Sequence, residues 1–193
     1  MSRLVGYRVV NLTPDESGQA YTYWLCGDGV WLWAENPHLV ASINTAPCLV
    51  RGLPPGQNML TLKHGRIPGR FWDLALSVFF AHPETECFIA VTWQDGAYHM
   101  VKPEQVGEAA SIHFTPVPDT VLELHSHPNM AAGFSSIDDA DEQGLKLYGV
   151  VGWKQRRPTE VELRLGAYGY FQPVKWSDVF DGELWGAFEK EVE

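Results

Sequence analysis

Two histidines separated by a single residue, His125 and His127, are the side chains of this sequence best suited to chemistry. Residues two apart in a β-strand project from the same face, so both imidazoles can bind one metal ion. Asp139 follows at the predicted start of a helix, from which its carboxylate can reach the same ion. Two histidines and one carboxylate leave the fourth position of a tetrahedral Zn²⁺ ion open for water, which indicates a catalytic rather than a structural zinc site.

The residues before Asp139 are suited to a turn that brings the carboxylate back. Pro128 has no N–H for a β-ladder and predicts the end of the strand. Seven residues separate it from Ser136, and Ser136-x-x-Asp139 predicts the first turn of a helix. The neighbouring Ser135-x-x-Asp138 is also an ordinary capping pattern, which needs no metal. No single residue here indicates a site, but the combination of five positions at set spacing does.

From His125 to Asp139 the sequence resembles the signature of the JAMM (MPN-type) zinc metalloproteases, in which a glutamate lies upstream of His-Ser/Thr-His-Pro and of Ser-x-x-Asp. The resemblance covers roughly residues 67–175 and is greatest to cytosolic bacterial members, some of them encoded beside ubiquitin-like proteins. It implies Zn²⁺ held by His125, His127 and Asp139. It further implies that the Ser136 hydroxyl stabilises the oxyanion, and that the fold is α+β, of the MPN/JAMM (cytidine-deaminase-like) type, with a mostly antiparallel sheet flanked by helices.

The resemblance also requires a glutamate that activates the attacking water, and three candidates stay open. Glu86 adjoins the apolar run of a predicted strand and is favoured. Glu84 lies two residues earlier, and Glu123 shares a strand face with His125. Solvated surface charge is the ordinary role of such residues. In the implied mechanism, Zn²⁺ lowers the pKa of its bound water towards ~7, and Glu86 takes the proton and delivers it to the leaving amine.

Other catalytic chemistries are disfavoured by the same pattern. The three cysteines, Cys26, Cys48 and Cys87, include no CxxC pair, which argues against a disulfide framework and against a thiolate zinc site. Cys87 lies in an apolar run, where burial raises the pKa of a thiol and makes it a poor nucleophile. Ser126 faces away from the two flanking histidines if the segment is a strand, so a Ser-His-Asp triad is not expected.

The elements expected to position these residues are mostly strands. Residues 1–65 predict a β-rich N-terminal extension, with a hairpin turn at Gly27-Asp28-Gly29. Residues 66–193 predict the metalloprotease core, which ends in an amphipathic C-terminal helix. Periodicity predicts helices over 68–81, over 136–148 and from 177, and strands over 87–93, 97–101, 120–126, 150–153 and 161–170.

Composition and charge restrict the partners. The 193 residues are 45% hydrophobic and carry a formal net charge of −10, so nucleic acids and anionic membranes would be repelled. The first residues lack a signal-peptide stretch, and no run reaches the ~20 apolar residues of a membrane-spanning helix. A cytoplasmic protein is expected. The acidic surface favours a basic protein partner, and the sequence does not indicate an oligomeric state.

Three functions are consistent with these residues. The favoured one, implied by the resemblance, is a zinc peptidase or isopeptidase that cleaves after the C-terminal tail of a ubiquitin-like protein, in a conjugate or in a precursor. A small-molecule zinc amidohydrolase and a non-catalytic scaffold are the alternatives, and the intact motif speaks against the scaffold. Only 38 residues separate Glu86 from His125, so the insertions with which larger relatives grip two ubiquitins are expected to be short or absent.

Overall fold

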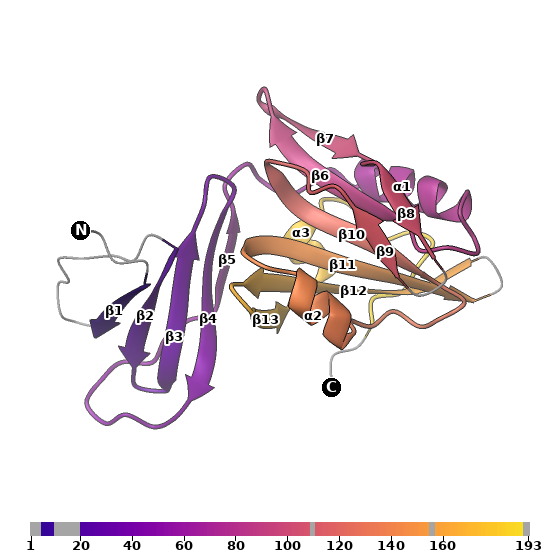
Figure 1. Cartoon of the computed structure of the whole chain (residues 1–193). Helices are drawn as coiled ribbons and strands as arrows, with labels where there is room; N and C mark the ends of the chain where they lie inside the picture. Colours follow the sequence, from indigo (N-terminus) through magenta and orange to yellow (C-terminus); the bar gives the residue numbers. More distant parts are fainter. Residues whose placement is uncertain (1–4, 10–19, 109–110, 155–156, 191–193) are drawn as a thin grey trace. The chain divides into compact units, whose positions relative to one another are not determined.

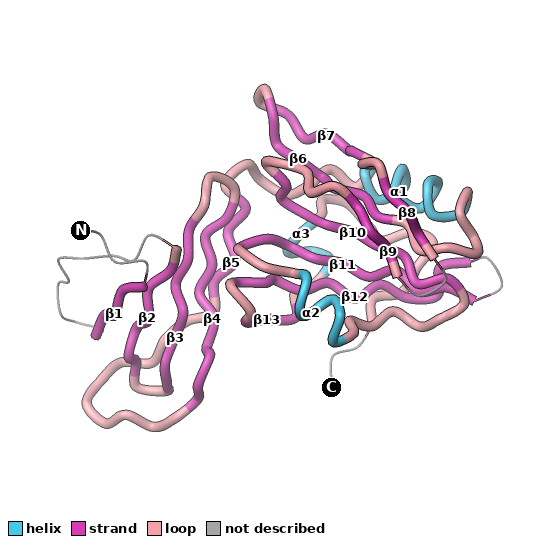
Figure 2. The backbone as a smooth tube through the Cα atoms, viewed as in Figure 1, coloured by secondary structure: helices cyan, strands magenta, loops and turns pink. Residues whose placement is uncertain are grey.

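The computed structural model describes residues 5–9, 20–108, 111–154 and 157–190, and the chain divides into two compact units. One unit spans Met1–Lys63 and the other spans His64–Glu193. The division lies close to the boundary expected after residue 65. Each unit is built around its own β-sheet, and Figures 1 and 2 show the elements along the chain and the predominance of strands.

The first unit contains one sheet of five strands in sequence order. The strands are β1 Val5–Val9, β2 Tyr21–Cys26, β3 Gly29–Glu35, β4 Leu39–Pro47 and β5 Met59–Leu62. β2 to β5 pair antiparallel, whereas β1 pairs parallel with β2. At the turn between β2 and β3, the Asp28 carboxylate accepts hydrogen bonds from the Trp31 indole N–H (2.9 Å) and the Gly56 N–H (2.8 Å). The hairpin expected at this turn is therefore confirmed and is tied to the loop that follows β4.

The second unit contains a six-stranded sheet. Its elements are α1 Arg70–Phe80, β6 Phe88–Gln94, β7 Ala97–Val101, β8 Gln105–Gly107, β9 Ile112–Phe114, β10 Thr120–Pro128, α2 Ser136–Asp141, β11 Leu145–Lys154, β12 Arg157–Ala167, β13 Tyr170–Pro173 and α3 Trp176–Val179. The sheet order is β13-β12-β11-β10-β6-β7, and β8 pairs only with β9 among the described strands. Every pairing in the large sheet is antiparallel except that of β10 with β11. The fold is therefore α+β, mostly β, with short helices.

The helices divide the two faces of the six-stranded sheet between them. α1 and α3 lie on one side and α2 on the other (Figure 1). Phe79 of α1 packs against Trp153 of β11 at a ring distance of 6.4 Å, and Trp72 meets Trp176 of α3 edge-on at 5.2 Å. Apolar residues three and four apart share one face of α1, which buries Phe71, Trp72, Ala75, Leu76 and Phe79. This packing covers one face of the sheet and leaves the other face for polar residues.

The helix predicted over residues 136–148 is wrong in its second half. α2 ends at Asp141, and β11 begins at Leu145. The backbone leaves the helix at Glu142, whose ψ of 81° is not helical, and Gly144 then adopts a φ of +91°, a left-handed conformation that favours glycine. Leu145 and Leu147 are buried two residues apart, as in a strand, and β11 then pairs with both β10 and β12. Burial in the sheet outweighs the helical tendency of this segment.

The C-terminal helix predicted from residue 177 is also wrong. Beyond the single turn of α3, the described tail is not helical, because Gly182 and Gly186 adopt φ values of +79° and +77°. The tail pairs with β12 instead: the Val161 N–H donates to the Phe188 carbonyl at 2.7 Å. The longest helix among the described residues, α1, has 11 residues, and none is long and apolar enough to cross a membrane.

Gly152 of β11 lies where the segment after β10 comes closest to the sheet. A Cβ atom at this position would overlap the backbone of residues 130–132, so the close approach requires glycine. We predict that Gly152→Ala lowers the free energy of unfolding by about 1–3 kcal/mol, because the segment must shift to admit the methyl group. Urea unfolding of the metal-free protein measures this loss.

Gly133→Ala is the matched control in the same segment. Its added methyl would meet only Lys190 Nζ, at 3.5 Å, so the free energy of unfolding should change by no more than about 0.5 kcal/mol. Equal stability of the two variants would contradict the close packing of this segment on β11.

Candidate metal centre

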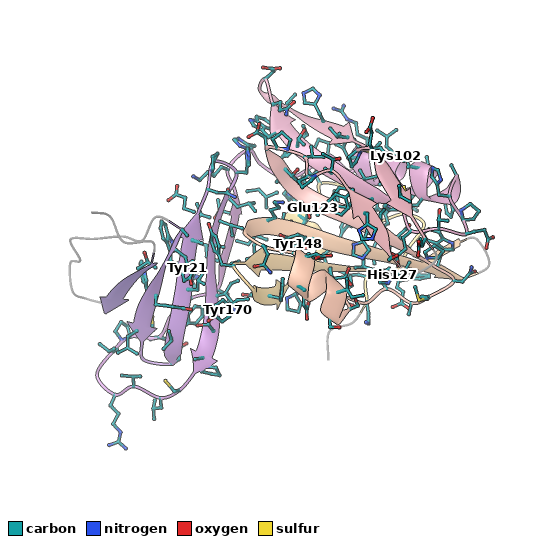
Figure 3. The ribbon with its side chains drawn as sticks, in the orientation of Figure 1. Tyr21, Lys102, Glu123, His127, Tyr148 and Tyr170 are labelled. Carbon is teal, nitrogen blue, oxygen red and sulfur yellow. The ribbon has the colours of Figure 1, made fainter. Side chains whose placement is uncertain are left out.

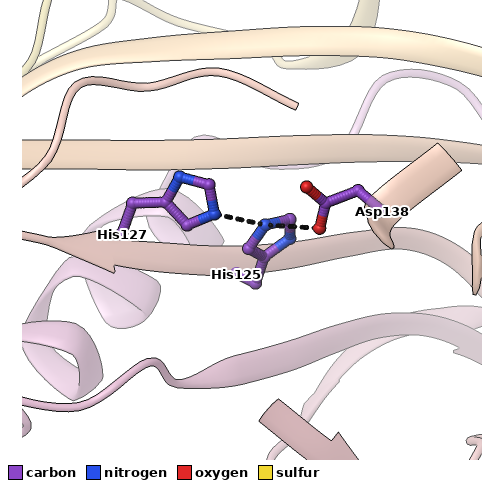
Figure 4. A group of neighbouring side chains, drawn as sticks. All are labelled: His125, His127 and Asp138. Atoms are coloured by element: carbon purple, nitrogen blue, oxygen red, sulfur yellow. Dashed lines mark hydrogen bonds and ion pairs between the residues drawn. The ribbon is translucent and has the colours of Figure 1, made fainter. Parts of the chain in front are cut away.

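His125 and His127 lie side by side on the polar face of β10. This strand is held on both edges, antiparallel to β6 and parallel to β11, so its backbone cannot shift without breaking two ladders. Both imidazoles are buried, with exposed fractions of 8% and 9%. Their Nε2 atoms lie 3.1 Å apart (Figure 4), as the alternation of side chains along a strand predicts.

Asp138 completes the cluster from α2. Its Oδ1 lies 3.2 Å from His125 Nε2, and one ligand atom from each of the three residues lies within 4.8 Å of the others (Figure 4). Ligand atoms bound tetrahedrally to one ion at ~2.0–2.1 Å are roughly 3.3 Å apart, so the observed spacings fit a shared metal ion. The residues present therefore match the donor set that a mononuclear metal centre needs.

The third ligand differs from the one chosen from the sequence. Asp139 is turned away from the histidines, and its Oδ1 accepts a hydrogen bond from Arg164 Nη1 at 2.6 Å. Its side chain is 52% exposed. Successive residues of a helix point ~100° apart, so Asp139 points away from the site that Asp138 faces. The assignment of Asp139 as a ligand is therefore corrected to Asp138.

The serine beside this aspartate also differs by one position from the one expected, because it is Ser135 and not Ser136. Ser135 is the N-cap of α2: its Oγ accepts from the Asp138 N–H at 3.3 Å, and its N–H and hydroxyl both donate to Asp138 Oδ2 at 2.6 Å. Ser135 thus holds one carboxylate oxygen while the other faces His125. Ser136, expected from the sequence to assist catalysis, is exposed and is not among the residues that line the cavity beside the histidines.

Glu86 approaches the cluster from the other side. Its Oε1 lies 3.7 Å from His127 Nε2, the residue is only 7% exposed, and it is not one of the three clustered residues. The Glu86 N–H donates to the Glu108 carbonyl at 2.7 Å, and the next N–H, of Cys87, donates to Ser126 Oγ at 3.0 Å. The backbone on both sides of the Glu86 side chain is therefore fixed, by the segment after β8 and by β10.

The other two candidate glutamates are placed differently. Glu84 lies in the exposed turn before Glu86 and does not line the cavity. Glu123, labelled with His127 in Figure 3, does line the cavity, but its Oε1 accepts a hydrogen bond from Lys146 Nζ at 2.6 Å. Of the three glutamates expected from the sequence, Glu86 is the one that is buried, faces the histidine pair and has no lysine or arginine partner among its described contacts.

The electrostatics prepare these groups to bind a cation. Burial, with His125 beside it, lowers the pKa of His127 to about 4, so the imidazole is neutral near pH 7 and its lone pair is available. Burial alone would raise the pKa of Asp138, but the hydrogen bonds from His125 and Ser135 outweigh it and hold the pKa well below its usual range. Burial raises the pKa of Glu86, opposed by His125 and reinforced by the Asp138 charge.

The cluster opens into a cavity of about 430 Å³. The stacked rings of Phe88 and Phe114, 3.6 Å apart, form part of its apolar wall, together with Ile112 and Ile137. The β8–β9 hairpin, which the sequence did not predict, contributes the residues from 112 to 114. None of the described residues that line the cavity is lysine or arginine, whereas several carry carboxylates. The cavity lining therefore combines apolar side chains with carboxylates.

Neither alternative nucleophile lines this cavity. Ser126 is fully buried, on the opposite side of β10 from its neighbouring histidines, and its Oγ accepts from the Cys87 N–H at 3.0 Å. Burial raises the pKa of the Cys87 thiol. The geometry thus disfavours Ser126 and Cys87 as nucleophiles at this cavity.

The sequence matches no protein-family model and no curated protein. Its function is therefore inferred from the chemistry of the cavity. Asp138 and its hydrogen-bond partner Ser135 each precede by one position the residue expected from the sequence. The signal that could have located them was the capping pattern Ser135-x-x-Asp138 itself. Arg164 and Glu142, buried beside the cluster, carried no sequence signal because they lie far apart in the chain.

We predict one metal ion per chain, bound by the three clustered residues. His125→Ala and Asp138→Ala should each lose it, because two ligands do not hold zinc tightly, whereas Asp139→Asn removes no ligand and should lose much less of it. Elemental analysis after purification without chelator measures the stoichiometry. A metal content that falls for Asp139→Asn but not for Asp138→Ala would reverse the assignment.

Proposed function

We propose that this protein is a zinc-dependent peptidase that cleaves the bond after the C-terminal tail of a ubiquitin-like protein, in a conjugate or a precursor. The observation that carries the proposal is the cluster of His125, His127 and Asp138 on a cavity wall, with the buried Glu86 at 3.7 Å. With Ser135 and Asp138 in place of their neighbours, the motif still resembles that of the JAMM metalloproteases. An MPN-type core is the finer fold assignment that goes with this proposal.

Zinc is the metal that this donor set favours. Two imidazole nitrogens and one carboxylate oxygen are borderline ligands, which suit Zn²⁺ better than Mg²⁺ or Ca²⁺, ions that prefer all-oxygen sites. Three protein ligands leave a position for the reacting water, and the cavity gives that position access to substrate. The absence of thiolate ligands further favours a catalytic over a structural role.

The proposed reaction is hydrolysis of an amide bond. Zinc, when bound, supplies a water of lowered pKa and polarises the substrate carbonyl. Glu86 accepts the proton from the attacking water as a new C–O bond forms, and then donates it to the nitrogen as the C–N bond breaks. The raised pKa of Glu86 suits a group that must both take and return a proton. Ser135 rather than Ser136 has the hydroxyl on the cavity wall, where it orients Asp138.

The cavity lining supports a peptide substrate with an amine leaving group. No lysine or arginine is present among the described lining residues to bind a carboxylate next to the scissile bond. The carboxylates there suit the amine that departs instead, which becomes positively charged. The apolar wall formed by Phe88, Phe114 and Ile112 suits an extended tail that lies beside the β8–β9 hairpin.

A small-molecule amidohydrolase is the second candidate. The cavity of about 430 Å³ falls within the range of sites that enclose small ligands, which favours it. Because the described lining lacks lysine and arginine, amides that carry a free carboxylate are disfavoured as substrates. The substrates of this second candidate would therefore be neutral or basic amides.

We predict that Glu86→Gln retains zinc but lowers kcat by at least about 100-fold, because the amide cannot take up the proton of the attacking water. Glu84→Gln is the matched control, two residues earlier and exposed, and should keep wild-type kcat. Steady-state kinetics with the metal content measured in parallel separates the two effects. Activity that survives Glu86→Gln would exclude Glu86 as the base.

The substrate prediction is tested with ubiquitin and bacterial ubiquitin-like proteins fused through their C-terminal glycine to a reporter. Cleavage should occur after the glycine, stop with phenanthroline and persist after iodoacetamide, because no cysteine lines the described cavity. Eukaryotic ubiquitin should be cut less efficiently than a cognate protein. Cleavage blocked by alkylation but not by chelation would contradict the metalloenzyme, and turnover of small amides alone would favour the second candidate.

A further inference from the structure

Among the residues whose burial the structure describes, Arg164 is the one buried arginine, and it contacts the segment that carries Asp138. Arg164, on β12, is 7% exposed, and its guanidinium is sandwiched between the rings of Phe134 and Phe171 at 3.6 and 3.8 Å from their centroids. A guanidinium is planar and weakly hydrated, so it can stack between aromatic rings while its N–H groups donate in the plane. The stacking fixes the plane in which those donors point.

The in-plane donors of Arg164 reach two carboxylates of the α2 segment. Nε donates to Glu142 Oε2 at 2.8 Å, and Nη2 lies 2.6 Å from the same oxygen. Nη1 donates to Asp139 Oδ1 at 2.6 Å. Together with the ring of Phe134, these contacts lie on both sides of Asp138 in the sequence. The arginine therefore holds the segment on both sides of the residue that faces His125.

α2 cannot hold this position through its own packing. It has six residues, and none of them is buried. A helix this short is not stable in isolation, because its few hydrogen bonds do not offset the cost of nucleation. The Ser135 cap orders the first turn internally but does not attach it to the sheet. The contacts to Arg164 supply that attachment, and Phe134 also meets the His125 ring edge-on at 6.4 Å.

We propose that Arg164 is a positioning residue for the metal centre, which holds Asp139, Glu142 and Phe134 against β12 so that the Asp138 carboxylate stays within reach of the histidine pair. The proposal rests on the metal-binding part of the proposed function. It also gives Asp139 a role: this aspartate is not a ligand but an anchor of the ligand beside it. Outer residues that orient metal ligands typically change metal affinity by 10–100-fold when replaced.

The test measures metal affinity and ligand geometry in the full-length protein, without substrate. Zn²⁺ affinity comes from competition with a chromophoric chelator, and the visible absorption spectrum of the Co²⁺-loaded protein reports the coordination geometry. Arg164→Lys keeps the charge but cannot stack and donate to both carboxylates. We expect it to weaken Zn²⁺ binding by roughly 10-fold or more and to alter the Co²⁺ bands.

A second variant avoids the buried arginine, whose replacement could impair folding. Asp139→Asn changes a half-exposed side chain and should weaken Zn²⁺ binding in the same direction as Arg164→Lys, by a smaller factor. Asp141→Asn is the matched control: it removes an equal charge from the same helix, without a bond to Arg164 in the structure, and so accounts for the general loss of negative charge. Its affinity and Co²⁺ spectrum should stay closer to wild type than those of Asp139→Asn.

The outcomes separate this inference from the proposed activity. Zn²⁺ affinity within twofold of wild type in both Arg164→Lys and Asp139→Asn, with unchanged Co²⁺ spectra, overturns the positioning role even if the peptidase activity is real. The same holds if Asp139→Asn and Asp141→Asn weaken binding equally. Weakened binding with altered spectra supports the role even if no ubiquitin-like fusion is cleaved. A wild-type protein that binds no metal overturns both.

Discussion

The convergence of two buried imidazoles on one face of a central strand is the constraint on which the rest of the site depends. Polar groups removed from water cost several kcal/mol unless they gain partners. The surrounding elements supply partners to His125 and His127 from two directions, Asp138 from α2 and Glu86 from the segment before β6. Because β10 is held by β6 and β11, the histidines are fixed, and the approaching elements must adapt to them.

A rigid face of this kind requires close packing on the opposite face of the sheet. α1 and α3 provide this with a cluster of tryptophan and phenylalanine rings, in which Trp72 meets Trp176 and Phe79 meets Trp153. The alternation along β10 links the two faces: Ser126 points away from the histidines and bonds to the N–H that follows Glu86. The strand that presents the histidines thus also positions the backbone of the glutamate.

Local periodicity made the histidine pair, α1 and the first hairpin predictable, because each depends on residues close in sequence. The third residue of the cluster could not be predicted in this way. Ser135-Ser136 and Asp138-Asp139 are both doublets, so the Ser-x-x-Asp pattern occurs twice, one residue apart. Only the rotation of the helix determines which aspartate faces the histidines. The tail after residue 179 and the second half of the 136–148 segment depend on pairing with distant strands and on Gly144 and Gly182. Such pairing leaves no local pattern.

Two carboxylates in one cavity acquire opposite properties from their surroundings. Asp138 accepts two hydrogen bonds from Ser135 and lies against His125, which favours its ionised form and suits a ligand. Glu86 is buried without such donors, and burial raises its pKa, which suits a group that exchanges a proton. The two carboxylates cannot exchange these properties, because the N–H and hydroxyl that donate to Asp138 belong to Ser135, the cap of α2, and not to the segment before β6. The division between the proposed ligand and the proposed base is therefore built into the backbone that carries each residue.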